Sequence, residues 1–168
     1  LSSKKLAEER GSCPDAEEYG FKERFSNKTA IAPTASISII CGGASPGVEP
    51  IAANSYTHKT LSGSYNVRNK YLINVLKKYN KNNAEIWSSI TTNQGSVSHL
   101  EFLSNQEKDV FKTAFELDQK WIIELGADRT PYISQAQSIN IFLPADVHKK
   151  KLHQIHFQAW KKGLKSLY

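Results

Sequence analysis

The sequence predicts a helix-rich α/β domain. Short apolar runs containing β-branched residues alternate with longer segments of helical periodicity, in the order strand, helices, strand, helix, strand. The length of 168 residues suffices for one hydrophobic core but not comfortably for two. We therefore expect a single unit over residues 1–168 with parallel strands. These strands are too few to form a closed sheet by themselves.

The first predicted element is the end of a helix over residues 4–10. Gly11 follows it and Pro14 lies just beyond, which is the usual punctuation of a helix C-terminus. The next residues, 14–27, are polar and predict a loop.

A buried strand is predicted over residues 29–32, which are apolar and partly β-branched. Pro33 ends that strand and suits the first turn of a short helix that carries residues 36–40. The glycines and prolines at 42–47 predict a loop after this helix.

Three helices are predicted in the middle of the chain. Residues 69–79 carry an apolar stripe, 82–90 form a second helix, and 105–125 give the strongest pattern. Ser104 and Glu107 form a capping box before this third helix, and Gly126 is expected to end it. The apolar residues expected along it recur at helical spacing: Val110, Phe111, Ala114, Phe115, Trp121, Ile122 and Leu125.

The last elements are a strand at 138–143, a helix and a further strand at 164–168. Pro144 with Asp146 predicts the start of the helix, which runs to about residue 162 and is ended by Gly163. We expect four residues of this helix to face inward: Leu152, Ile155, Ala159 and Trp160. The amides of Gln135, Gln137 and Asn140 are expected to satisfy nearby backbone groups.

Composition leaves the class of partner open. The net charge of +6 allows nucleotides or nucleic acid as partners, and lysines gather near residues 149–165. No apolar run approaches the roughly 20 residues that span a bilayer, so we expect no membrane partner. Two cysteines suit a reducing cytoplasm better than a disulfide framework. His153 and His156 lack the carboxylates of a metal motif, so no metal site is predicted.

The turn at residues 33–38 is the strongest candidate for chemistry. The N-terminus of a helix presents unpaired N–H groups and a partial positive charge, which together suit an anion such as phosphate. Thr34, Ser36 and Ser38 add hydroxyl groups there. A plain helix cap made by Thr34 or Ser36 explains the same residues, and spacing alone leaves both readings open.

Five stretches of the chain carry a resemblance to one known family: LAEERGSCP, IAPTASISIICGGASPGVEP, NSYTHKTLSGSYNVRNKYL, YISQAQSINIFL and HQIHFQAWKKGLKSLY. Together they resemble the large, catalytic subunit of class I ribonucleotide reductase. The resemblance covers nearly the whole chain, with its motifs in the family's order. Ala35-Ser36 and the final residues 165–168 resemble class I more than the adenosylcobalamin-dependent class.

The resemblance implies a fold, a site and a reaction. The family folds as a ten-stranded α/β barrel, of which residues 1–168 would be a C-terminal fragment. The family reduces ribonucleotides to deoxyribonucleotides by radical chemistry. Tyr168 matches the first tyrosine of the family's radical-transfer pair. The loop expected to bind the diphosphate of a ribonucleoside diphosphate comprises Pro33, Thr34, Ala35, Ser36 and Ile37.

The departures from the family imply a chain that is inactive alone. The family's finger-loop motif Asn-x-Cys-x-Glu and its redox cysteines are absent from this sequence, and neither Cys13 nor Cys41 matches a catalytic cysteine. We expect no cofactor in this chain, since the family depends on a radical cofactor held by a metal-containing small subunit. The implied partners are the remainder of the large subunit, that small subunit, and thioredoxin or glutaredoxin. The alternatives are a catalytically inactive stand-alone remnant and a basic nucleic-acid-binding module.

Overall fold

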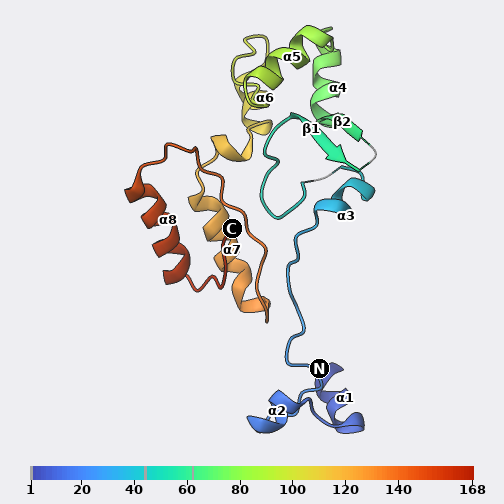
Figure 1. Ribbon diagram of the computed structural model, residues 1–168, viewed down its shortest axis with the longest axis vertical. Helices are drawn as coiled ribbons and strands as arrows, with labels where there is room; N and C mark the ends of the chain where they lie inside the picture. Colours follow the sequence, from blue (N-terminus) through green and yellow to red (C-terminus); the bar gives the residue numbers. More distant parts are fainter. Residues whose placement is uncertain (1, 44, 62) are drawn as a thin grey trace.

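The computed structural model describes residues 2–43, 45–61 and 63–168, so residue 44 of the predicted loop lies outside it. Figure 1 shows α1 and α2 set apart from the rest of the chain by an extended segment, with α7 and α8 side by side. The helices are α1 (Ser2–Arg10), α2 (Pro14–Glu18), α3 (Ala35–Ile40), α4 (Lys70–Lys78), α5 (Ala84–Thr92), α6 (Asn105–Val110), α7 (Lys120–Arg129) and α8 (Lys149–Lys161). Strands β1 (Ser55–Thr60) and β2 (Gly63–Arg68) and the 3₁₀ turns η1 (Ala114–Glu116) and η2 (Thr130–Tyr132) complete the described elements.

The N-terminal prediction is half right. Helix α1 ends where Gly11 predicts, but α2 occupies part of the expected loop at 14–27. Pro14 stands at the first turn of α2 and Asp15 and Glu17 follow, which favours a helix N-terminus over a loop.

One core forms around α4 and α5. Asn69 caps α4, because its side-chain oxygen accepts hydrogen bonds from the N–H groups of Tyr71 and Leu72. This helix lies where the periodicity predicts, although Tyr71 itself is exposed. The buried residues of this core are Leu72, Leu76, Trp87, Ile90, Val97, Leu100, Leu103 and Phe111.

The β1–β2 hairpin is absent from the sequence-based prediction. It pairs in antiparallel register from Ser55 opposite Arg68 to Thr60 opposite Gly63. In β1 polar residues stand on both faces, so the alternation of apolar and polar residues that marks a half-buried strand is missing there. In β2 the alternation is limited to Tyr65 and Val67, which share one face with Gly63.

The predicted helix at 105–125 is wrong as a single element. The Ser104–Glu107 capping box starts it as expected, but α6 ends at Val110. A second capping box, between Thr113 and Glu116, opens η1, and α7 starts only at Lys120. Several side chains expected along the apolar stripe are exposed: Val110, Phe115, Trp121 and Leu125.

Gly126 lies inside α7 instead of ending it. A Cβ atom there would come within 2.8 Å of Ile139 Cδ1 and 3.3 Å of Leu164 Cδ2. Glycine therefore lets α7 approach the C-terminal segments closely. The second core lies in this region and consists of Ile123, Ile155 and Ala159, with Ile141, Leu143, Leu164 and Leu167 packed against it.

Helix α8 begins later than Pro144 predicts. His148 is its N-cap, and its Nδ1 accepts a hydrogen bond of 3.1 Å from the N–H of Lys150. Ile155 and Ala159 face the core as expected, whereas Leu152 and Trp160 are exposed. The helix ends before Gly163, as predicted.

The three predicted strands appear as extended segments with parallel pairing. Ile31 pairs with Gln137 in parallel. Tyr168 donates its N–H to the Ile139 carbonyl at 2.9 Å and accepts from the Ile141 N–H at 3.0 Å, which is also a parallel pattern. The predicted parallel arrangement is therefore present. The prediction that segment 29–32 is buried is wrong, because its residues are exposed or half-buried.

The Ser104–Glu107 capping box should make the stability of this region depend on pH. Hydrogen bonds from the backbone and hydroxyl groups of Ser104 lower the pKa of the Glu107 carboxyl below 4.5. Because the folded pKa is depressed, this contribution is present above pH 4.5 and is lost as the pH falls through the folded value. The stability advantage over Glu107→Gln, measured by urea unfolding, should therefore shrink below pH 4.5. A pH-independent difference would contradict this, and Glu101→Gln is the control.

Candidate phosphate-binding site

The predicted phosphate turn is formed and accessible. Thr34 precedes α3, and its N–H and Oγ1 both donate to the Pro46 carbonyl, at 3.1 and 3.0 Å. It makes no side-chain capping hydrogen bond to α3, so the reading of Thr34 as a plain cap is wrong. Pro33, Ala35, Ser36 and Ile37 are exposed, while Thr34 is half-buried.

The first turn of α3 offers free donors. The N–H groups of its first residues, Ala35, Ser36 and Ile37, have no acceptor within a helix that starts at Ala35. Ser38, by contrast, is buried and donates its hydroxyl to the Ala35 carbonyl at 2.8 Å. Ser38 therefore supports the turn, whereas the exposed Ser36 hydroxyl is open to a ligand.

A cavity of about 490 Å³ lies between α3 and the hairpin. Of the predicted loop residues only Ala35 lines it, so the structure does not place the other four in the cavity wall. The lining is mostly apolar and also contains Ser38, Ile39, Gly43, Ser45, Pro46, Ile51, Ala52, Ala53, Tyr56, His58, Val67, Arg68, Asn69 and Tyr71.

Sequence reasoning missed the basic side chains near this turn. His58 and Arg68 line the cavity from the hairpin. Lys70 donates to the Gly42 carbonyl at 2.7 Å, just beyond the C-terminal end of α3. The basic residues are visible in the sequence, as THK within β1 and RNK at the end of β2, but only the hairpin brings them beside α3.

The loop after α3 contains a buried carboxylate. Glu49 is 4% exposed; one of its oxygens accepts a hydrogen bond from the Asn140 amide, and the other has no partner among the described residues. A Cβ atom at Gly47 would lie 2.7 Å from the Glu49 Oε1, so glycine leaves room for this carboxylate. The sequence predicts that the Asn140 amide satisfies nearby backbone groups. Instead, its hydrogen bond to Glu49 connects the loop to segment 135–141.

Gln137 confirms the expected role of a buried amide. Its amide nitrogen donates to the Gly126 carbonyl at 2.8 Å, and its oxygen accepts from Arg129 Nε at 2.9 Å. These bonds fix segment 135–141 against α7.

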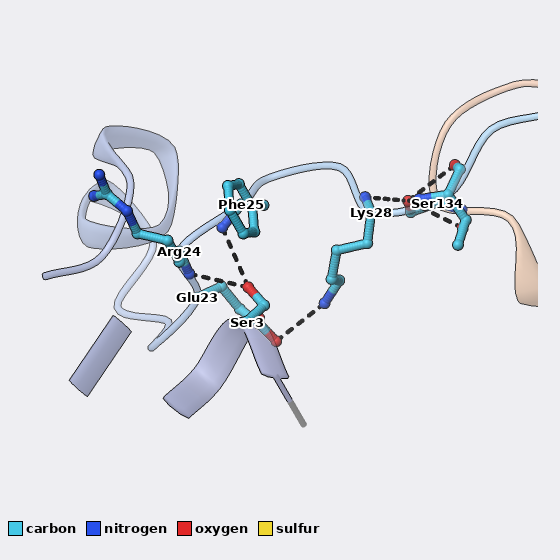
Figure 2. Close-up of polar contacts among 7 residues, drawn as sticks. Ser3, Glu23, Arg24, Phe25, Lys28 and Ser134 are labelled. Atoms are coloured by element: carbon cyan, nitrogen blue, oxygen red, sulfur yellow. Dashed lines mark hydrogen bonds and ion pairs between the residues drawn. The ribbon is translucent and has the colours of Figure 1, made fainter. Parts of the chain in front are cut away.

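The chain before the turn is anchored at Ser134, which directly precedes segment 135–141. Figure 2 shows the Ser134 hydroxyl beside Lys28, and this hydroxyl accepts from the N–H groups of Lys28 and Thr29 at 2.9 Å each. The Lys28 ammonium also lies 3.1 Å from a Glu23 carboxylate oxygen. The parallel pair at Ile31 then sets the direction in which the chain reaches Pro33.

Tyr168 and the turn lie along different edges of segment 135–141. The segment uses the N–H of Ser138 toward Ile31 and the N–H of Ile141 toward Tyr168. These N–H groups are an odd number of residues apart, so they point to opposite edges of an extended segment. The Tyr168 side chain is 74% exposed.

Other chemistry is sparse in the described part of the chain. Cys13 and Cys41 are free thiols. No group of three or more His, Cys, Asp or Glu side chains among the described residues could hold a metal ion. Every helix in that same part is too short or too polar to cross a membrane.

Comparison with known proteins assigns the family. The model of the ribonucleotide reductase barrel domain matches residues 4–168. The ribonucleoside-diphosphate reductase large subunit of Invertebrate iridescent virus 6 is 54% identical over 163 residues, which are 95% of this chain and 17% of the relative. A putative large subunit of Frog virus 3 is 40% identical and covers 99% of this chain, with 29% of its own length matched.

A solved structure agrees with these sequence matches. The class Id ribonucleotide reductase alpha subunit of Actinobacillus ureae superposes with a TM-score of 0.80 at 38% identity, over 99% of this chain and 30% of that protein. The chain thus spans less than a third of the length of the relatives named here. It belongs to the ribonucleotide reductase barrel-domain family, as its similarity to class I large subunits predicts.

Proposed function

We propose that this chain contributes substrate-diphosphate binding and a radical-transfer tyrosine to a ribonucleoside-diphosphate reductase large subunit. The observation that carries the proposal is the exposed first turn of α3, with N–H groups that have no acceptor within the helix and the free hydroxyl of Ser36. In a member of this family, such a turn suits the diphosphate of a ribonucleoside diphosphate. Pro33, Thr34 and Ile37 shape the same turn.

The reaction proposed for the complete enzyme replaces the ribose 2′-hydroxyl with hydrogen. Cysteine thiols act as the reductant, and thioredoxin or glutaredoxin restores them. Tyr168 passes the radical inward from a small subunit that carries the metal-containing radical cofactor; a phenol can release an electron and a proton together. Cys13 and Cys41 match neither catalytic nor redox cysteines, so the rest of the large subunit must supply them and this chain alone is inactive.

Ser36→Glu should weaken binding of the ribonucleoside diphosphate. The new carboxylate would stand in the first turn of α3 and repel the diphosphate, so KM should rise at least about tenfold, or ~1.4 kcal/mol. The measurement is steady-state reduction by a complete large subunit carrying this segment, assayed with its small subunit.

The matched control is Ser26→Glu, which adds the same charge at an exposed serine of the connecting segment. It should leave KM unchanged. An unchanged KM in Ser36→Glu, or an equal rise in both variants, would remove the α3 turn from the substrate site.

A further inference from the structure

A second cavity, of about 230 Å³, lies between the hairpin and α5. Residues that face each other across the hairpin share a face, so Ser55, Thr57, Asn66 and Arg68 present their side chains toward the same side. Tyr56, His58 and Val67 belong to the opposite face, which lines the α3 cavity. We call the second space the Arg68 cavity; its lining is Ser55, Tyr56, Thr57, Asn66, Arg68, Ala84, Trp87, Ser88 and Thr91.

Arg68 is held in this cavity without a charged partner. Its Cζ lies 4.9 Å from the ring centroid of Trp87. The Trp87 ring is itself fixed, because it is 2% exposed and its Nε1 donates to Asn82 Oδ1 at 2.9 Å. Among the described residues the Arg68 guanidinium makes no ion pair and no hydrogen bond, so stacking orients it while its N–H donors stay available.

The remaining lining favours an anion. It contains hydroxyl groups and one amide but neither Asp nor Glu. Thr57 donates to the Asn66 side-chain oxygen at 3.2 Å, which leaves the Asn66 amide nitrogen as a donor for another acceptor. Ser55 and Thr91 bond to each other at 3.0 Å and tie β1 to α5 at one side of the cavity.

The size of the cavity limits the ligand. Whole small-molecule sites occupy roughly 300–1,000 Å³, and the α3 cavity falls in this range while the Arg68 cavity is smaller. The Thr91 hydroxyl already donates to the Trp87 carbonyl at 2.9 Å, so the donors left for a ligand beside the guanidinium are the Asn66 amide and the Ser88 hydroxyl. An unpaired, planar guanidinium beside such donors is an arrangement that binds oxyanions through paired hydrogen bonds. The space therefore suits one phosphate group better than an entire nucleotide.

We propose that the Arg68 cavity binds a phosphate group, either as inorganic phosphate or as the phosphate of a small monoester. The site is distinct from the diphosphate turn of α3, because its guanidinium stands over Trp87 on the α5 side of the hairpin, although Arg68 and Tyr56 line the α3 cavity as well. It uses no residue of the turn at 33–37 and does not depend on the proposed substrate site.

Trp87 provides a direct reporter for this site. Trp121 and Trp160 are 65% and 72% exposed, so Trp121→Phe with Trp160→Phe should leave a folded chain with Trp87 as its sole indole. Inorganic phosphate and glycerol 3-phosphate are titrated separately against Trp87 fluorescence, with chloride holding the ionic strength constant. A saturable change in Trp87 fluorescence with either compound supports the site. The compound with the lower Kd identifies the form of phosphate that the site prefers. A linear, non-saturating change with both would overturn it.

The variant Arg68→Gln should weaken phosphate binding at least about tenfold, equal to ~1.4 kcal/mol. Lys59→Gln removes the same charge from the same hairpin outside the cavity lining, and its Kd should stay within about twofold of the parent. Equal weakening by both variants would show non-specific attraction and contradict the proposal.

Two more variants keep the result interpretable. Ser88→Leu fills the cavity without changing the charge and should weaken phosphate binding as strongly as Arg68→Gln; unchanged binding would exclude the cavity even if Arg68→Gln fails to fold. Ser36→Glu should leave this titration unchanged, so loss of substrate binding at α3 and loss of phosphate binding here are separate outcomes.

Discussion

Asn54→Leu is expected to destabilise the chain by at least about 3 kcal/mol. Asn54 is fully buried, and its amide nitrogen donates to the carbonyls of Gly95 at 3.0 Å and Phe111 at 2.7 Å. Its side-chain oxygen accepts from Asn69 at 2.8 Å. Leucine has a similar size but none of these groups, so it would leave buried polar partners unsatisfied at about 1–3 kcal/mol each.

The same change should impair both cavities. Asn54 directly precedes β1 and Asn69 directly follows β2, and the Asn69 N–H also donates to the Asn54 carbonyl at 2.9 Å. The pair therefore holds the two ends of the hairpin together. Because the hairpin forms a wall of the α3 cavity and of the Arg68 cavity, both cavities should change shape, and phosphate binding in the Arg68 cavity should weaken.

Urea unfolding measures the stability, with Asn74→Leu as the control. Asn74 is an exposed asparagine on α4, so the same substitution there should change the free energy of unfolding by less than about 0.5 kcal/mol. A similar small change for Asn54→Leu would mean that the hydrogen bonds around Asn54 do not hold the hairpin in place.

The α3 turn could be predicted from sequence because its signals are local. Pro33 and the hydroxyl residues that follow it fix a helix start within a few positions. Arg68 could not be found in this way, because its significance depends on Trp87, nineteen residues later in the chain, lying under its guanidinium. A contact between a cation and an aromatic ring on two different elements produces no periodic pattern in the sequence.

Helical periodicity predicts one helix where the structure has two, because both helices share one apolar pattern. Apolar residues keep helical spacing from Val110 to Leu125, although the Thr113–Glu116 capping box restarts the chain between α6 and α7. Trp121 and Trp160 are exposed for a related reason: an apolar stripe predicts an amphipathic face but does not predict which part of the molecule covers it. The sequence-based prediction lacks the hairpin because β1 has no apolar face and β2 has only Tyr65 and Val67 to mark one.

Gly95→Ala should cost at least about 2 kcal/mol more than the same change at Gly163. Both glycines have a positive φ, +81° and +78°, so alanine meets a similar conformational penalty at each. A Cβ at Gly163 would have nothing within 4 Å, whereas at Gly95 it would lie 2.4 Å from Ala53 Cβ and 2.7 Å from Ala53 Cα. The excess cost is therefore steric, in the range typical of overpacking.

Ala53→Gly separates the two parts of this penalty. In the Gly95→Ala background it removes the contact at 2.4 Å but leaves the backbone contact at 2.7 Å, so it should restore stability only in part. Urea unfolding of the four variants in this cycle gives the coupling energy between the two positions. A coupling near zero, or equal costs at Gly95 and Gly163, would contradict a close approach of these backbones.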